Sequence, residues 1–177
     1  MLKHLHLTRR QWLGILRWTL YSLLLLFVLL TQTIVLSRKP VFGAKLAPVG
    51  VVLICVCIRE GAEKGGLFAL LGSLFWYMSG ADYGCLSVAI IPVGAILAAM
   101  LCRTAFTQRL LSTALCCFVI CLVNDLVIFA FKLLLEKLAA ENLWRVLLPG
   151  TCLTMLAVPP VYLLVKLISR IGGKHDL

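Results

Sequence analysis

The sequence predicts an all-α integral membrane protein, folded as a six-helix transmembrane bundle with both termini in the cytoplasm. Of its 177 residues 62% are hydrophobic and only 14% are charged, whereas a soluble domain is about 45–50% apolar and about 25% charged. The apolar residues also form six runs separated by short polar segments. Because a membrane helix needs about 20 apolar residues, the chain has room for six crossings. Its composition excludes two classes of protein, an ordinary soluble enzyme and a disordered chain.

The chain divides into a basic N-terminal segment, 1–17, one membrane domain, 18–168, and a short C-terminal segment, 169–177. The first apolar run, Trp18–Leu36, is longer than the roughly 7–15-residue apolar core of a signal peptide, and no small-residue cleavage site follows it. We therefore expect it to be retained as the first span.

The second and third runs, Leu46–Ile58 and Leu67–Met78, are short and are separated by a polar, glycine-containing loop at 59–66. At 1.5 Å per residue the second run reaches about 20 Å, against a hydrocarbon core of about 30 Å. The two runs are consistent either with full crossings or with a re-entrant hairpin, which would leave four crossings.

The last three apolar runs are Gly84–Leu101, Leu110–Leu135 and Leu143–Ile168. Pro92 is expected to break the first of them, because proline removes a helical hydrogen bond. Pro149, Pro159 and Pro160 are expected to interrupt the last run in the same way.

The basic residues decide between six and four crossings. There are 17 Lys and Arg against 7 Asp and Glu, a formal net charge of +10. Six spans with a cytoplasmic N-terminus place eleven of the 17 basic residues inside and six outside, whereas four spans give nine and eight. The positive-inside rule favours six spans. The charge therefore indicates orientation in the bilayer, and nucleic acid is not expected as a partner.

Glycines are concentrated around the third run. They are Gly61, Gly65, Gly66, Gly72, Gly80 and Gly84. Several are four residues apart, a spacing that lets helix backbones approach closely in membranes. The pattern favours packing among the second, third and fourth spans, with a docking face for a partner's helix as the alternative. It does not fit a phosphate-binding loop, which follows a strand and ends in Gly-Lys-Ser/Thr.

Asp125 is the only acidic residue deep inside a predicted span, and Asn124 precedes it. A carboxylate at the bilayer centre costs about 2.5–3.5 kcal/mol on insertion scales, so such a residue is a candidate for function. Two interpretations stay open: a buried hydrogen-bonding role in packing, and a contact with a partner or ligand.

No catalytic, metal or cofactor site is expected. The eight cysteines include no Cys-x-x-Cys pair, and the three histidines lie near the termini. The cysteines are expected to act as small buried hydrophobes. Neither a Ser/His/Asp set nor paired carboxylates occur at a spacing that predicts acid–base chemistry.

The order of polar and small residues resembles one known family. Gln32 closes the first span, the short second run leads to Arg59-Glu60-Gly61, and glycines open and close the third span. The matching glycines are Gly61, Gly65, Gly66, Gly72, Gly80 and Gly84. The chain resembles the bacterial rod shape-determining protein MreD family in these residues, and also in its length, its basic N-terminus and the lengths of its spans. It departs from the family in having Ala47-Pro48 where Pro-Asp is frequent, and no acidic residue near Trp76.

The resemblance implies a non-enzymatic, multi-pass scaffold of the bacterial cytoplasmic membrane, within the machinery that elongates the cell wall. The partners that it implies are an MreC-type protein, an MreB-type filament, a RodA-type glycosyltransferase and a penicillin-binding transpeptidase. The family's fold is similar to the six-helix substrate-binding subunits of energy-coupling-factor transporters. A vitamin-binding subunit of that kind is the competing interpretation, although the Ala-x-x-x-Ala docking face of those subunits has no counterpart in Trp18–Leu36, which contains no alanine.

Overall fold

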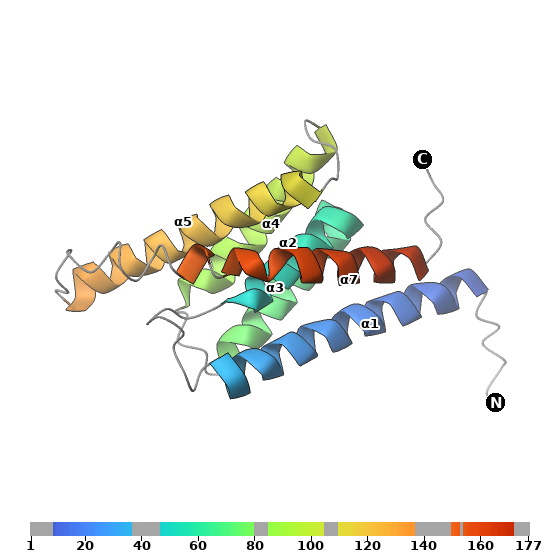
Figure 1. Ribbon diagram of the computed structural model, residues 1–177, viewed down its shortest axis with the longest axis horizontal. Helices are drawn as coiled ribbons and strands as arrows, with labels where there is room; N and C mark the ends of the chain where they lie inside the picture. The colour runs from blue at the N-terminus through green and yellow to red at the C-terminus, as the bar shows by residue number, and fades with distance from the viewer. Residues whose placement is uncertain are drawn as a thin grey trace, which may run out of the picture.

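The computed structural model describes residues 9–36, 47–79, 85–104, 110–136, 150–152 and 154–171. Within these ranges the regular elements are helices, arranged as Figure 1 shows. In chain order they are α1 (Arg9–Thr31), the π-helical turn η1 (Gln32–Leu36), α2 (Pro48–Glu60), α3 (Ala62–Met78), α4 (Leu86–Thr104), α5 (Leu110–Glu136) and α7 (Val158–Ile171).

Four helical stretches are long and apolar enough to cross a membrane. They are Gln11–Ile34, Leu86–Thr104, Leu110–Phe131 and Gly150–Arg170. The all-helical class and the membrane character predicted from the sequence are confirmed at this level. The remaining two helices, α2 and α3, have 13 and 17 residues, and both are shorter than those four stretches.

The short helix α2 lies at the centre of the fold and contacts α1, α3, α4, α5 and α7. Every residue of α2 except Arg59 is buried. A helix that is apolar on all sides is stable in a protein core or in lipid, and the other helices enclose α2 in the first of these ways (Figure 1).

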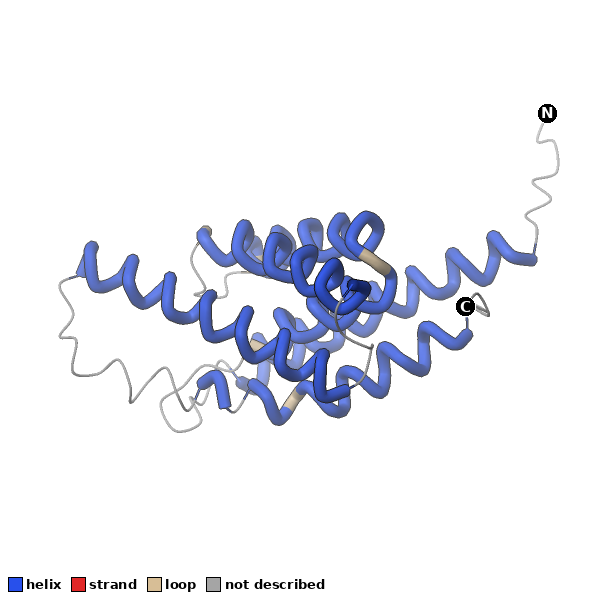
Figure 2. The backbone as a smooth tube through the Cα atoms, turned by 90° about the horizontal axis from the view of Figure 1, so that it is seen from above, coloured by secondary structure: helices blue, strands red, loops and turns tan. Residues whose placement is uncertain are grey.

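Helices α1 and α7 contact each other. The start of α1 and the end of α7 lie at the same end of the molecule in both views (Figures 1 and 2).

The polar loop expected at 59–66 is wrong, because α2 and α3 are separated only by Gly61. Its φ is 96°, a left-handed conformation that glycine adopts without steric cost. The Gly61 N–H donates to the Cys57 carbonyl at 2.9 Å, and the Gly61 carbonyl accepts from the Gly65 N–H at 2.9 Å. One residue thus reverses the chain, and Gly65 and Gly66 belong to α3.

The break expected at Pro92 is also wrong, because α4 runs through it without interruption. Proline lacks the N–H that would bond the carbonyl four residues earlier, which is that of Val88. The buried Ser73 hydroxyl of α3 lies 3.3 Å from the Val88 carbonyl, within donating distance, and 2.9 Å from the Leu70 carbonyl. Because the hydroxyl has one proton, the Leu70 and Val88 carbonyls share it, and the neighbouring helix partly replaces the hydrogen bond that Pro92 cannot make.

The interruption expected at Pro159 and Pro160 is confirmed. Residues 154–156 are helical, Ala157 forms a turn, and α7 begins at Val158. Both prolines lie in the first turn of α7, where a missing N–H costs no helical hydrogen bond. Pro149 lies outside the described residues.

The Ser73 contact predicts a coupling between Ser73 and Pro92. Ser73→Ala should lower the free energy of unfolding by about 1 kcal/mol, because the Val88 carbonyl loses its donor. In a Pro92→Ala background the same substitution should cost clearly less, since residue 92 then supplies an N–H. Thermal unfolding of the four variants in detergent measures the coupling, and equal costs of Ser73→Ala in both backgrounds would contradict it.

Candidate functional site

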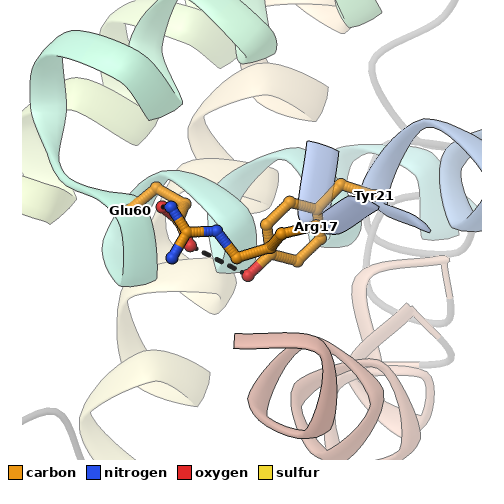
Figure 3. A network of polar contacts seen from close by, with 3 residues as sticks. All are labelled: Arg17, Tyr21 and Glu60. Carbon is orange, nitrogen blue, oxygen red and sulfur yellow. Dashed lines mark hydrogen bonds and ion pairs between the residues drawn. The ribbon is translucent and has the colours of Figure 1, made fainter. Parts of the chain in front are cut away.

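The described residues contain a buried charge network at the contact between α1 and α2 (Figure 3). The Arg17 guanidinium and the Glu60 carboxylate form an ion pair, with Nη2 and Oε2 2.9 Å apart. The Tyr21 hydroxyl donates to the other carboxylate oxygen, Oε1, at 3.0 Å. The sequence places Arg17 and Tyr21 four residues apart, so both side chains lie on one face of α1.

Burial makes this network important for stability. The side chains of Arg17 and Glu60 are only 12% and 3% exposed, and Tyr21 is fully buried. A buried ion pair is weak evidence of net stabilisation, but removing one partner costs about 3–5 kcal/mol because an uncompensated charge remains. The network therefore fixes how α1 meets α2.

Aromatic rings extend the network toward α3. Trp18 packs edge-on against Tyr21, with centroids 5.8 Å apart, and lies 5.7 Å from Phe68 of α3. Tyr21 and Phe68 are 6.4 Å apart. These separations are those of favourable aromatic pairs, so the same turn of α1 contacts both helices of the α2–α3 hairpin.

Two further arginines lie near the C-terminal end of α2. The Arg59 guanidinium stacks over the Tyr162 ring of α7 at 5.5 Å, with Nη2 3.5 Å from the Tyr162 hydroxyl. The Arg103 side chain of α4 lies next to Gly61, 3.7 Å from where a Cβ would be. Cations at this end of a helix are favoured by the helix dipole. The end of α2 is thus joined to α1 and α7 through charged groups, and the Arg103 side chain of α4 lies close to it.

Three of the glycines singled out in the sequence pack against other helices. A Cβ on Gly65 would lie 2.5 Å from the Cys57 backbone of α2, and one on Gly66 would lie 2.8 Å from the Ile96 side chain of α4. A Cβ on Gly72 would lie 2.4 Å from Leu53. The contacts are those of packing among α2, α3 and α4, the first of the two interpretations. Gly80 and Gly84 lie outside the described residues.

The remaining sequence candidates lie apart from the charge network. Gln32, in η1, is 5% exposed, and Asn124, in α5, is 3% exposed. The Asn124 amide nitrogen donates to the half-buried Asp125 carboxylate at 3.4 Å. Gln32 and Asn124 each have a side-chain oxygen with no hydrogen-bond partner among the described residues.

The cysteines are all free thiols, and most are buried, although Cys85 and Cys152 are exposed. The Cys102 and Cys116 sulfurs lie 3.9 Å apart, between α4 and α5. Within the described part of the chain, His, Cys, Asp and Glu do not gather in a group of three or more that could hold a metal ion.

Sequence reasoning missed Arg17 and Tyr21, the two partners of Glu60. The sequence places Arg17 in the basic N-terminal segment, because the first apolar run begins at Trp18. Helix α1 begins nine residues earlier, at Arg9, which brings Arg17 into the packed part of the bundle. The available signal was Glu60, an acidic residue that directly follows an apolar run and Arg59.

No family model, curated protein or solved structure matches the chain. The fold and the site therefore define its class by themselves. It is an all-helical protein with four stretches able to cross a membrane, built around a short buried helix that a charge network holds at one end.

The charge network predicts that removing one charge destabilises the protein more than removing both. Glu60→Ala should lower the free energy of unfolding by about 3–5 kcal/mol, because Arg17 stays buried without its partner. Combining Glu60→Leu with Arg17→Met should recover part of that loss, since both charges are then removed although the buried Tyr21 hydroxyl still lacks its acceptor. Unfolding in detergent measures the effect, and a double variant as unstable as Glu60→Ala would contradict it.

The glycine contacts predict that a Gly→Ala substitution lowers the stability of the protein at Gly65 and raises it at Gly14. Gly65→Ala should destabilise by about 1–3 kcal/mol, because its methyl group overlaps the α2 backbone. Gly14→Ala is the matched control: no atom lies within 4 Å of a Cβ there, so the higher helix propensity of alanine should stabilise by up to about 1 kcal/mol. Thermal unfolding compares the two variants, and equal shifts would argue against close α2–α3 packing.

Proposed function

We propose that the chain is a non-enzymatic scaffold of the bacterial cell-elongation machinery, of the MreD type, in the cytoplasmic membrane. In this proposal it crosses the membrane six times with both termini in the cytoplasm. Its partners are an MreC-type protein and, through that protein, an MreB-type filament, a RodA-type glycosyltransferase and a penicillin-binding transpeptidase.

The observation that carries the proposal is the common location of five of the residues on which the family resemblance rests. Glu60, Gly61, Gly65, Gly66 and Gly72 all belong to the α2–α3 hairpin, and each has a packing, turning or ion-pair role there. A hairpin fixed in this way gives the surrounding helices a defined arrangement, as a scaffold requires.

The surface of the bundle supports the same proposal. Large apolar side chains are exposed on α1, α3, α4 and α5, among them Phe27, Leu71, Leu97 and Leu115. In a membrane these faces meet lipid or the helices of other proteins. The binding energy of such a scaffold would come from helix faces and not from a ligand pocket.

Co-purification tests the proposal. The tagged chain, expressed with an MreC-type single-span protein and solubilised in mild detergent, should retain that protein at near-equal amounts. An unrelated single-span protein of similar length is the control and should be lost. Gly65→Ala should lower retention more than Gly14→Ala, because only the first alters the hairpin.

The competing transporter interpretation predicts a different outcome. Loss of the MreC-type protein, together with retention of an energising module from a vitamin transporter, would overturn the scaffold proposal. A vitamin that raises the melting temperature of the purified chain by several degrees would point the same way.

A further inference from the structure

A groove of about 900 Å³ runs along an exposed face of α1. The described residues that line it all belong to α1, from Gln11 at one end to Leu26 at the other. Its smallest lining residues are Gly14 and Ser22, with Trp18 between them. No atom lies within 4 Å of where a Cβ on Gly14 would be. The groove is therefore open to the surroundings of this membrane-spanning stretch.

The length of the groove matches one leaflet of a bilayer. From Gln11 to Leu26 the helix rises about 22 Å. A bilayer is about 40–45 Å thick with its polar headgroups, so one leaflet is about 20–22 Å thick. The spanning stretch of α1 continues beyond the groove to Ile34. A lipid of one leaflet fits this length, whereas a partner's membrane helix would lie along the whole stretch.

The Gln11 end of the groove lies at the cationic end of the bundle. Helix α1 begins with Arg9 and Arg10, which directly precede Gln11, and the end of α7 lies at the same end of the molecule (Figures 1 and 2). The charged side chains that the structure describes at this end are six cations and two carboxylates: Arg17, Arg59, Lys64, Arg103, Lys166 and Arg170 against Glu60 and Glu63. Juxtamembrane cations attract anionic lipid, so this end of the groove favours a negatively charged headgroup.

Lys64 of α3 is the described cation that helix register places beside the groove. Trp18, which lines the groove, packs against Phe68 of α3 with ring centroids 5.7 Å apart. Further along, Leu25 lies 3.3 Å from where a Cβ on Gly72 would be, so α1 and α3 run in the same direction. Lys64 is one turn before Phe68 on the same face of α3, toward the start of α1. It is exposed and makes no ion pair among the described residues.

We propose that the groove binds one phospholipid with an anionic headgroup. An acyl chain lies along α1 between Gly14 and Leu26, where apolar side chains cover it. The phosphate lies at the Gln11 end, where Lys64 and the first residues of α1 supply positive charge. The site goes beyond the scaffold proposal and does not depend on any partner protein.

Native mass spectrometry of the full-length chain tests the site, with phosphatidylglycerol or phosphatidylcholine added in mild detergent. The chain should retain one phosphatidylglycerol about fivefold more tightly than phosphatidylcholine, because only the first lipid has a net negative charge. Gly14→Leu should weaken the binding of both lipids at least about fivefold, because its side chain fills the groove. The open space at Gly14 lets this variant fold, and its melting temperature checks that. Ser22→Leu fills the same groove if Gly14→Leu does not fold.

A matched pair of charge variants separates a site from general attraction to the cationic end. Lys64→Gln should weaken phosphatidylglycerol binding about fivefold and leave phosphatidylcholine binding unchanged. Arg170→Gln removes the same charge at the same end of the bundle, on α7, and should have a clearly smaller effect. Equal losses for these two variants, or unchanged lipid binding by a folded Gly14→Leu, would overturn the site. A dimer in the same spectra that Gly14→Leu abolishes would also overturn it, because a second copy of the chain would then occupy the groove.

Discussion

The burial of α2 is the constraint on which the rest of the structure depends. This helix is apolar on every face, so exposing any face of it to water is unfavourable. It is also too short to cross the bilayer core unaided. Five other helices cover it. Closest approach to α3 is possible because Gly65 and Gly72 have no side chains. The position of each surrounding helix then follows from its contact with α2, and helices whose outer faces are apolar suit a membrane environment.

Different polar groups lie at the two ends of α2. At its C-terminal end, Glu60 has two partners from α1, and neighbouring cations complement the helix dipole. At its N-terminal end, Pro48 supplies no N–H, and the Ala47 N–H is bonded to the Thr154 hydroxyl. The first end explains how the bundle is held together.

The sequence was sufficient for the class of the fold and insufficient for its contacts. Apolar run lengths predicted the helices, and α5 matches its predicted run to within one residue. The single-residue turn at Gly61 was missed because a run of charged and small residues looks like a loop, although glycine alone can reverse the chain. The continuity of α4 was missed because the donor to the Val88 carbonyl comes from Ser73, on another helix. Glu60, Gln32 and Asn124 were identified, but their surroundings depend on helix register, which one sequence does not specify.

Hydrophobic photolabelling tests the enclosure of α2 most directly. The chain is reconstituted in a bilayer with a lipid-soluble carbene precursor, irradiated, digested and analysed by mass spectrometry. The structure predicts strong labelling of the exposed side chains Leu67, Leu71 and Phe75 on α3 and little or no labelling of residues 48–60. Labelling of α2 as strong as that of α3 would show that lipid reaches the central helix, and would contradict the account.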